Sequence, residues 1–422
     1  MIVYTNSGIE WLGHYPKDWE ILKLKYLCNI DTGSKDTQDK IDDGLYPFFV
    51  RSPHIERLNE YTHDEEAVMT AGDGVGVGKV FHYYKGKFAA HQRVYVFTRF
   101  RKVLGRYIYY YLTSNLAFEV LSGNAKSTVD SLRRPMLAEF PVVVPSIKTQ
   151  KKIVRFLDLK IREIDNLIQS KSNVIALLEE KRQSIITEAV TKGLDPDVKM
   201  KDSVVEWIGN VPEHWEVSKI KRIAEIRPSN VDKKSVEGET EVYLCNYVDV
   251  YYNNEITSDL NFMRATAKKE QIDKFTLKKH DVIITKDSES PTDIAIPTWV
   301  AEDLMGVICG YHLSLIRPNN YFYGQYLYFC LESEQIREQF YSLANGVTRY
   351  GLSKDAIKNG LVPHPPLNEQ IEIANKLYNI TSDIEIIIKQ IKDQIEKLEE
   401  YRQSLIYEAV TGKIDVSEMN LD

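Results

Sequence analysis

The sequence predicts an α+β fold in which two globular mixed α/β domains are joined by two long antiparallel coiled-coil helices, as a pseudo-twofold internal repeat. Three observations lead to this prediction. Two sequence blocks each occur twice, the segments between them differ, and one block has the apolar spacing of a coiled coil. The period is about 200 residues, which indicates a duplicated domain, since solenoid repeats span roughly 20 to 50 residues.

The first repeated block contains two tryptophans. Glu10-Trp11-Leu12-Gly13, with Pro16 and Trp19-Glu20, returns as Glu206-Trp207-Ile208-Gly209, with Pro212 and Trp215-Glu216. The second block, residues 179–191, returns as residues 399–411. Constant ends around variable middles suggest one scaffold that presents two different binding surfaces.

We expect globular domains at residues 1–145 and 203–365. Strand-forming residues bounded by turn residues occur at 46–50, 93–97 and 142–144, and again at 281–285 and 312–316. Short helices are expected at 104–121 and 323–343. The variable stretch that ends at Thr348 is 24 residues longer than the one that ends at Thr128, and we expect the extra residues in loops.

The coiled-coil helices are predicted at residues 146–192 and 366–412. Their apolar residues recur with a 3.5-residue period over about five heptads, and Lys171, Arg182 and Arg402 fill the skipped places. Each helix is about 40 residues long, or roughly 60 Å, and needs a partner, for which the other helix is the simplest choice. The expected helix-pairing residues are Leu157, Ile161, Ile164, Ile168, Ile175, Leu178, Ile384, Ile388, Ile391, Ile395 and Leu398. Residues 193–202 read as a linker and 413–422 as a C-terminal tail.

A basic segment in the first domain indicates contact with nucleic acid. Between Lys79 and Arg106 there are eight cations and no Asp or Glu, with aromatic residues interleaved. Cations neutralise phosphates, and polar or aromatic side chains reach base edges. The alternative is a solvated surface above core aromatics at alternate strand positions. The eight are Lys79, Lys85, Lys87, Arg93, Arg99, Arg101, Lys102 and Arg106.

The second domain has a weaker basic segment that includes Arg264, Lys268 and Lys269. A polar turn also precedes each long helix, at residues 123–128 and 345–351, and either turn could face a ligand or act as a structural hinge. From these turns we select Lys126, Arg349 and Tyr350 as further DNA-binding candidates.

Catalytic and metal-binding patterns are absent from the sequence. The Gly72–Lys79 segment lacks the first glycine of a phosphate loop and has Val80 where a Ser or Thr is needed, so we expect a glycine-rich turn. The nine histidines lack metal-ligand spacing, and we identify no nucleophile with a base. We therefore predict no catalytic residues, no metal and no cofactor in this chain.

Composition indicates where in the cell the protein works and which partners it can have. No apolar run is long enough for a membrane span and no signal sequence begins the chain, so we expect a cytoplasmic protein without membrane partners. Cys28, Cys245, Cys309 and Cys330 have no pairing pattern and are expected to be buried thiols. The net charge of −7 leaves nucleic-acid binding open, because phosphate affinity depends on where the cations cluster.

Over essentially its whole length, the chain resembles the specificity subunit of Type I restriction-modification systems. The resemblance lies in residues 206–216, in the helix start Pro366-Leu367-Asn368-Glu369-Gln370, and in residues 402–412. It implies that each variable region is a target-recognition domain, that the helices are spacers, and that the catalytic sites lie on partner subunits. The first copy departs from this pattern, with Ser146-Ile147-Lys148-Thr149-Gln150 at its helix start.

We therefore expect a sequence-specific DNA-binding subunit that reads an asymmetric, bipartite site on double-stranded DNA. The resemblance implies two methyltransferase subunits as partners, with or without two restriction (translocase) subunits, which carry out adenine methylation and restriction. The alternative is a free-standing DNA-binding regulator or decoy with the same fold and no enzyme partners. An enzyme with an unfamiliar active site and a scaffold that binds no nucleic acid are the remaining alternatives.

Overall fold

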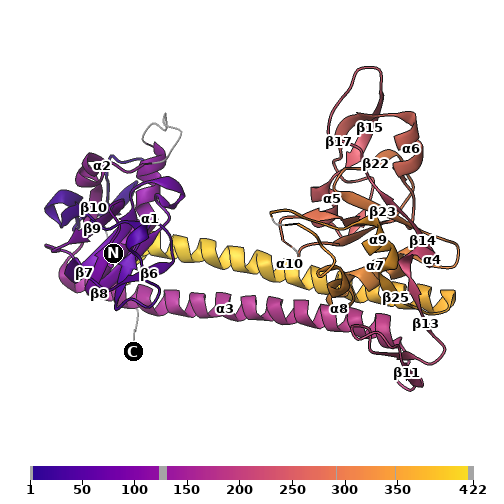
Figure 1. The fold of residues 1–422 in the computed structure, drawn as a ribbon. Coiled ribbons are helices and arrows are strands. Elements are labelled where there is room, and N and C mark those ends of the chain that lie inside the picture. Colours follow the sequence, from indigo (N-terminus) through magenta and orange to yellow (C-terminus); the bar gives the residue numbers. More distant parts are fainter. Residues whose placement is uncertain (1–2, 123–130, 291, 347, 417–422) are drawn as a thin grey trace. The chain divides into compact units, whose positions relative to one another are not determined.

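The computed structural model describes residues 3–122, 131–290, 292–346 and 348–416. It divides into two compact units, residues 1–172 with 392–422, and residues 173–391. Two long helices contribute to both: the first half of α3 (Ile147–Lys192) and the second half of α10 (Leu367–Thr411) belong to unit 1, and the remaining halves belong to unit 2. Figure 1 shows both helices.

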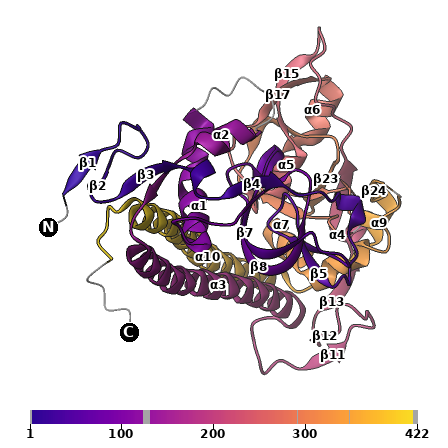
Figure 2. The ribbon, with the colours of Figure 1, turned by 90° about the vertical axis from the view of Figure 1, so that its left-hand side faces the viewer.

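Unit 1 is built around a six-stranded sheet with the order β4-β9-β7-β8-β5-β6. Figure 2 shows these strands and α1 in indigo and purple. Two small sheets, β1-β2 and β3-β10, lie outside the main sheet. The elements are β1 (Tyr4–Asn6), β2 (His14–Pro16), β3 (Glu20–Lys23), η1 (Leu24–Tyr26), β4 (Asn29–Thr32), η2 (Thr37–Asp39), β5 (Tyr46–Phe49), β6 (Ile55–Leu58), β7 (His63–Ala71), η3 (Gly74–Gly76), β8 (Phe81–Ala90), β9 (Val94–Thr98), α1 (Gly105–Ser122), α2 (Arg134–Glu139) and β10 (Pro141–Val144).

Unit 2 contains a five-stranded sheet, β14-β23-β19-β21-β16, and a four-stranded sheet, β17-β15-β22-β18. Three further pairs are β11-β12, β13-β25 and β20-β24. The elements are β11 (Met200–Asp202), β12 (Asn210–Pro212), β13 (Glu216–Lys219), α4 (Ile220–Ile223), β14 (Ala224–Pro228), β15 (Thr240–Cys245), α5 (Tyr247–Tyr251), β16 (Glu255–Ile256), β17 (Met263–Ala267), α6 (Lys269–Phe275), β18 (Thr276–Leu277), β19 (Val282–Thr285), β20 (Asp287–Ser288), β21 (Pro297–Val300), β22 (Leu304–Cys309), β23 (Leu313–Pro318), α7 (Gly324–Glu332), α8 (Glu334–Arg337), η4 (Glu338–Phe340), β24 (Tyr350–Gly351), α9 (Lys354–Asn359) and β25 (Leu361–His364).

The observed elements differ from the sequence predictions in three places. The extra length of the second copy lies between β14 and β19, where it forms strands and the helices α5 and α6 as well as loops. The helix expected at 323–343 is broken into α7, α8 and η4, because Ser333 has an extended backbone and its hydroxyl bonds Thr187 of α3 at 2.7 Å. The last residues of the expected linker form β11, which pairs with β12.

The ends of the long helices pack into the hydrophobic core of each unit. In unit 1, Leu405, Ile406, Ala409 and Val410 of α10 are buried in the same cluster as α1 and β10. In unit 2, Ile186, Ala189 and Val190 of α3 occupy the corresponding place. Burying a Leu, Ile or Val side chain contributes about 1.5 to 3 kcal/mol, so these helix ends are strongly held.

The two repeated blocks pack against each other within each unit. Gly412 follows α10 with φ +74°, and a Cβ there would lie 2.5 Å from Pro16 and 2.9 Å from Trp19. Gly193 follows α3 with φ +79°, and a Cβ there would lie 3.2 Å from Trp215. The left-handed backbone favours glycine at both places. The packing of these glycines against the tryptophan block therefore explains why the same residues recur in both copies.

Two further contacts recur in both units. The Tyr107 hydroxyl donates to the Val410 carbonyl at 2.9 Å, and the Tyr326 hydroxyl donates to the Val190 carbonyl at 3.2 Å. These bonds join α1 to the end of α10 and α7 to the end of α3.

The glutamine shared by both helix starts makes the second contact. Gln150 accepts from the Leu104 amide at 2.9 Å, and Gln370 accepts from the Tyr323 amide at 2.7 Å. Each also donates to the carbonyl of a proline at the helix start, Pro145 or Pro365, at 2.8 Å. Both glutamines are fully buried. The first copy keeps this contact although its helix start is different, and Ser146 accepts from the Thr149 amide at 3.2 Å as an N-cap.

The middle of each long helix is exposed except at residues spaced by three and four. In α3 these are Ile161, Ile164, Ile168, Lys171, Ile175, Leu178 and Arg182, and in α10 they are Ile384, Ile388, Ile391, Ile395, Leu398, Arg402 and Leu405. Leu157 is also fully buried. All the expected helix-pairing residues are therefore buried or half-buried, which is the 3.5-residue pattern of a helix that packs along one stripe.

Polar side chains also join α3 to α10 within each unit. In unit 1, Asp165 pairs with Arg402 at 2.6 Å and Lys171 donates to Gln394 at 2.6 Å. In unit 2, Arg182 lies 3.6 Å from Glu385 and 2.8 Å from Glu332 of α7. In unit 1 the α10 number falls as the α3 number rises, so the two helix segments of that unit run in opposite directions.

Candidate nucleic-acid interface

The basic segment of unit 1 begins just before β8. It extends through β8, the turn after it, β9 and the loop that leads into α1. Arg93 precedes β9, and Arg99, Arg101 and Lys102 follow it. Seven of the eight predicted cations are exposed, namely Lys79, Lys85, Lys87, Arg93, Arg99, Arg101 and Lys102. Arg99 and Lys102 have φ of +53° and +59°, a left-handed backbone that is uncommon away from glycine. The loop is thus held in a specific, strained shape.

The fold brings carboxylates to this segment although its sequence contains none. Arg93 lies 3.2 Å from Asp73, Arg99 lies 3.9 Å from Glu65, and Lys102 lies 3.8 Å from Glu20. These acids come from other parts of the chain, so the sequence of the segment could not reveal them. Exposed ion pairs of this kind contribute about 0 to 1 kcal/mol, and phosphate can replace the carboxylate at little cost.

Arg106 has a different environment from the other seven cations. Its guanidinium pairs with Asp158 of α3 at 2.8 Å and lies about 5 Å from the ring centres of Tyr83, Tyr109 and Tyr110. Burial lowers its pKa, but the tyrosines and Asp158 together raise it. This arginine joins α1 to α3 inside unit 1.

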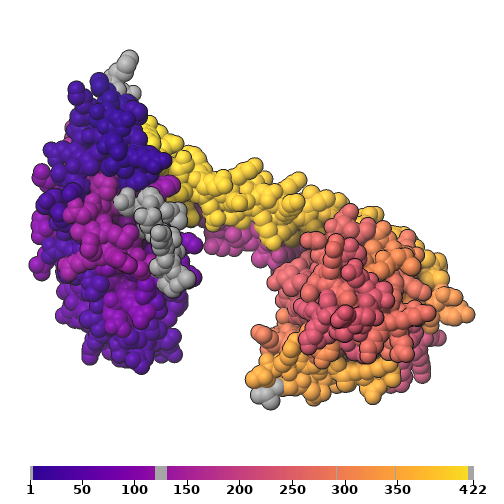
Figure 3. Space-filling model, turned by 90° about the horizontal axis from the view of Figure 1, so that it is seen from above, coloured from indigo at the N-terminus to yellow at the C-terminus, as the bar shows by residue number. Residues whose placement is uncertain are grey.

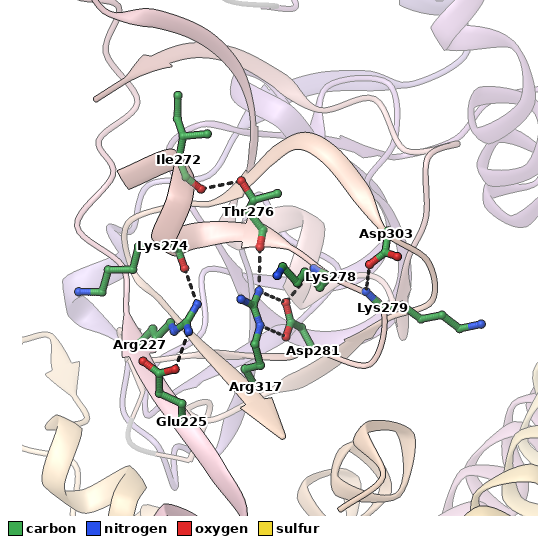
Figure 4. A network of polar contacts seen from close by, with 10 residues as sticks. All are labelled: Glu225, Arg227, Ile272, Lys274, Thr276, Lys278, Lys279, Asp281, Asp303 and Arg317. Carbon is green, nitrogen blue, oxygen red and sulfur yellow. Dashed lines mark hydrogen bonds and ion pairs between the residues drawn. The ribbon is translucent and has the colours of Figure 1, made fainter. Parts of the chain in front are cut away.

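The basic segment of unit 2 lies on β17 and α6. Arg264, Lys268 and Lys269 are exposed there. Figure 4 shows the polar network behind α6: Arg317 makes two bonds to Asp281, at 2.7 and 2.6 Å, and a third to the Thr276 carbonyl at 2.8 Å.

Arg227 completes this network. It donates to the Lys274 carbonyl at 2.9 Å, while the ammonium groups of Lys274 and Lys279 point away from the network. The bond from Arg227 fixes the backbone at the end of α6, where the Lys274 side chain projects away from the network.

The two polar turns differ in how far they can be described. Lys126 and the rest of residues 123–128 lie outside the described residues. In the second turn, Asn345 and Gly351 exchange backbone hydrogen bonds at 3.1 and 2.9 Å, and Tyr350 pairs with Ser288 in the β20-β24 sheet. Arg349 is exposed, and one of its nitrogens lies 3.2 and 3.1 Å from the two ring nitrogens of His312.

Five residues beside Arg93 and Arg349 were not selected from the sequence. They are Arg51, Asp73, Lys286, Asp287 and His312. The available signal was positional, since Asp73 follows the largely apolar residues 67–71 and Asp287 follows the largely apolar residues 282–285. Sequence alone did not reveal which cations would meet them.

Three features of the described residues bear on metal binding, thiol chemistry and membrane insertion. They contain no group of three or more His, Cys, Asp or Glu side chains with metal-binding geometry. The four cysteines are buried, as predicted, and burial raises the pKa of Cys28 to about 12, which disfavours a reactive thiolate. Of the helices in the described ranges, none combines the length and hydropathy that crossing a lipid bilayer requires.

Comparison with known proteins adds independent information. The family model described as "Type I restriction modification DNA specificity domain" matches residues 16–177 and 212–397. The Type I restriction enzyme MjaVIII specificity subunit of Methanocaldococcus jannaschii is 24% identical, with 96% of this chain and 95% of that protein aligned. The Type I restriction enzyme EcoDI specificity subunit of Escherichia coli is 21% identical, with 95% and 90% aligned.

A solved chain has the same fold. It comes from a structure of the type I R-M system titled for its complex assembly and conformational transition. The two chains share 12% identity with a TM-score of 0.69, over 95% of this chain and 99% of that one.

Proposed function

Because this chain belongs to the Type I restriction-modification DNA specificity family, we propose that it is the subunit that selects the DNA sequence for a Type I restriction-modification complex. One observation carries the proposal. Two globular regions of unrelated sequence are built on the same repeated contacts with the ends of α3 and α10. A constant frame with two different surfaces is suited to two different half-sites.

In this proposal, residues 21–145 and 217–365 each read one half of an asymmetric, bipartite site on double-stranded DNA. The seven exposed cations between Lys79 and Lys102 contact the DNA of the first half-site, most of them at its phosphates. Arg264, Lys268 and Lys269 do so in the second. Arg349 and Tyr350 lie on a turn that faces bases in this proposal, and the sequence alone proposes Lys126 for the same role in the first copy.

We further propose that α3 and α10 form an antiparallel coiled coil that fixes the distance between the half-sites, with the two copies related by a pseudo-twofold axis. The 3.5-residue pattern of partly buried residues in both helices supports this arrangement. The same domain limits follow: recognition domains at 1–145 and 203–365, helices at 146–192 and 366–412, a linker at 193–202 and a tail at 413–422.

Two methyltransferase subunits dock along the helices in this proposal, with or without two restriction subunits, and methylate a flipped adenine. Apolar residues that lie outside the pairing stripe provide a surface for them. Val174 and Leu177 of α3 are 44% and 64% exposed, and Ile386 and Ile387 of α10 are 56% and 43% exposed. Figure 3 shows part of the surface of α10 in yellow. Exposed apolar residues that cluster on a helix indicate contact with a partner.

The alternative of a free-standing regulator or decoy is not favoured. The relatives that align over nearly the whole chain are named as subunits of restriction enzymes. The test is to express the chain with its methyltransferase partner in a host that lacks the system and to sequence the methylated genome. We expect adenine methylation at one asymmetric, bipartite motif, and none from the purified chain alone. Methylation without a motif, or by the chain alone, would contradict the proposal.

A further inference from the structure

In each unit a carboxylate follows a strand in the middle of the main sheet. Asp73 lies two residues after β7, and Asp287 lies two residues after β19. The backbone beside them is bonded in the same way. The residue before the carboxylate, Gly72 or Lys286, donates to the carbonyl of Arg93 or His312, at 2.8 and 2.9 Å.

The carbonyl of that same residue is also bonded identically in the two units. Gly72 accepts from the Leu132 amide and Lys286 accepts from the Leu352 amide, both at 2.8 Å. The carboxylate residue also pairs with the backbone at or just after the end of the polar turn, Asp73 with Ser131 and Asp287 with Gly351. The two carboxylates therefore occupy equivalent places in one backbone frame.

In unit 1 the carboxylate lies between two arginines. Asp73 accepts from Arg51, which follows β5, at 2.7 Å through Oδ1, and from Arg93 at 3.2 Å through Oδ2. The side chains of Arg51 and Arg93 remain 41% and 57% exposed. Two guanidinium groups beside one carboxylate leave a net positive charge that faces solvent.

In unit 2 the same place has different side chains. Asp287 accepts from the His312 ring at 2.8 Å and from the Lys286 ammonium at 3.2 Å. Arg349 lies against the His312 ring, as described above. His312 has φ +63°, a strained conformation that persists only where the surroundings hold it.

The difference between the copies indicates a role in recognition. An ion pair that only held the sheet together would have no reason to change while the backbone bonds around it stayed the same. Here the frame is kept and the residues on it are exchanged: Gly72 for Lys286, and Arg93 for His312. Two half-sites of different sequence require this combination.

We propose that these two clusters, Arg51-Asp73-Arg93 and Lys286-Asp287-His312-Arg349, are equivalent base-reading positions, one for each half-site. The inference rests on the proposed function and names the residues that give it specificity. The carboxylate orients the cationic side chains before DNA binds. Arg93 and Arg349 then present paired N–H donors to an acceptor-rich base edge in the major groove, the O6 and N7 atoms of guanine.

Arginine-to-lysine variants separate this role from a structural one. Lysine keeps the charge and the ion pair, but it cannot donate two parallel bonds to guanine. We expect Arg93→Lys to relax the motif at a guanine position of one half-site, and Arg349→Lys to do so in the other. The preference for the cognate base should fall about 10- to 100-fold at that position.

The experiment sequences the methylated genome of a host that carries the full chain, or a variant, with its methyltransferase partner. Arg51→Lys is measured in parallel, so that poor folding of one variant leaves a second test of the first cluster. Arg134→Lys and Arg222→Lys are the matched controls, because these arginines are exposed and lie outside the clusters, Arg134 on α2 and Arg222 on α4. Both controls should keep the wild-type motif.

Relaxation confined to one half-site for each cluster supports the inference. An unchanged motif from active Arg93→Lys, Arg51→Lys and Arg349→Lys variants would overturn it while leaving the proposed function intact. If the wild-type chain itself yields no bipartite motif, the proposed function fails first.

Discussion

Removing one heptad from each long helix should shorten the spacer between the two half-sites. The deletions are residues 168–174 of α3 and 393–399 of α10. They remove Lys171 together with its partner Gln394 and leave the pairs Asp165–Arg402 and Arg182–Glu385 on either side. Ile175 then takes the place of Ile168, and Ile391 that of Leu398, so the apolar stripe stays continuous.

The size of the effect follows from helix geometry. Seven residues at 1.5 Å each shorten the connection by about 10 Å, which equals about 3 base pairs at 3.4 Å per pair. A heptad turns the helix to within about 20° of two full turns, so each recognition region keeps its face. Three base pairs rotate DNA by about 100°, at roughly 10.5 pairs per turn, so we expect weaker binding as well.

The assay is the motif found by methylome sequencing, with melting of the purified variant as a check on folding. We expect a spacer shorter by two to four base pairs with both half-sites unchanged. Deletion from α3 alone is the control, because it moves the two stripes out of register and should abolish methylation. An active double-deletion variant with the wild-type spacer would refute the idea that the helices set the distance.

Three further predictions follow from individual contacts. Replacing Arg99, Arg101 and Lys102 with Ala should weaken DNA binding and reduce the slope of log K against log salt by up to about 2.7, and an unchanged slope would show that these residues do not contact phosphate. Gly412→Ala should destabilise unit 1 by roughly 2 kcal/mol and lower its melting temperature. The control Gly13→Ala should cost about 1 kcal/mol, because Gly13 also has a positive φ, +64°, but its Cβ would meet no atom within 4 Å. Equal effects would mean that packing on Pro16 and Trp19 contributes little. Burial raises the pKa of Asp287, but the bonds from His312 and Lys286 outweigh it, so the folded-state pKa is lowered and the carboxylate stabilises the fold above its ordinary pKa. Asp287→Asn should therefore cost about 1 to 2 kcal/mol of unfolding free energy at pH 7. This difference between the variant and the wild type should disappear as the pH falls below about 4.

The helices could be predicted from the sequence because their signal is periodic and local. A 3.5-residue pattern over many turns leaves little doubt about α3 and α10, and their first residues, Ile147 and Leu367, follow Ser146 and Pro366 directly. Short strands such as β5, β9 and β23 were also predictable, since their residues are apolar and bounded by turns. The division of 323–343 into α7 and α8 was not, because it depends on the contact of Ser333 with a distant helix.

The ionic clusters could not be predicted because their members are far apart in the chain. Arg51 and Asp73 are 22 positions apart, and Arg106 and Asp158 are 52 apart. The absence of acids between Lys79 and Arg106 therefore says little about the charge that these residues meet once folded. The local excess of cations is a property of the sequence, whereas the pairing of each cation is a property of the sheet order.

The duplicated blocks constrain each other by packing, whereas the residues proposed to read DNA lie outside these contacts and can change. Gly412 packs against Trp19, and Gly193 packs against Trp215, so a change on one side of either contact is coupled to the other side. The clusters at Asp73 and Asp287 are less restricted, because the bonds that recur in their frame join backbone atoms. Replacing Arg93 with another residue alters a surface and not a core. Divergence of the recognition regions is therefore compatible with an unchanged pair of helices, and the copies could specialise for different half-sites without losing their shared scaffold.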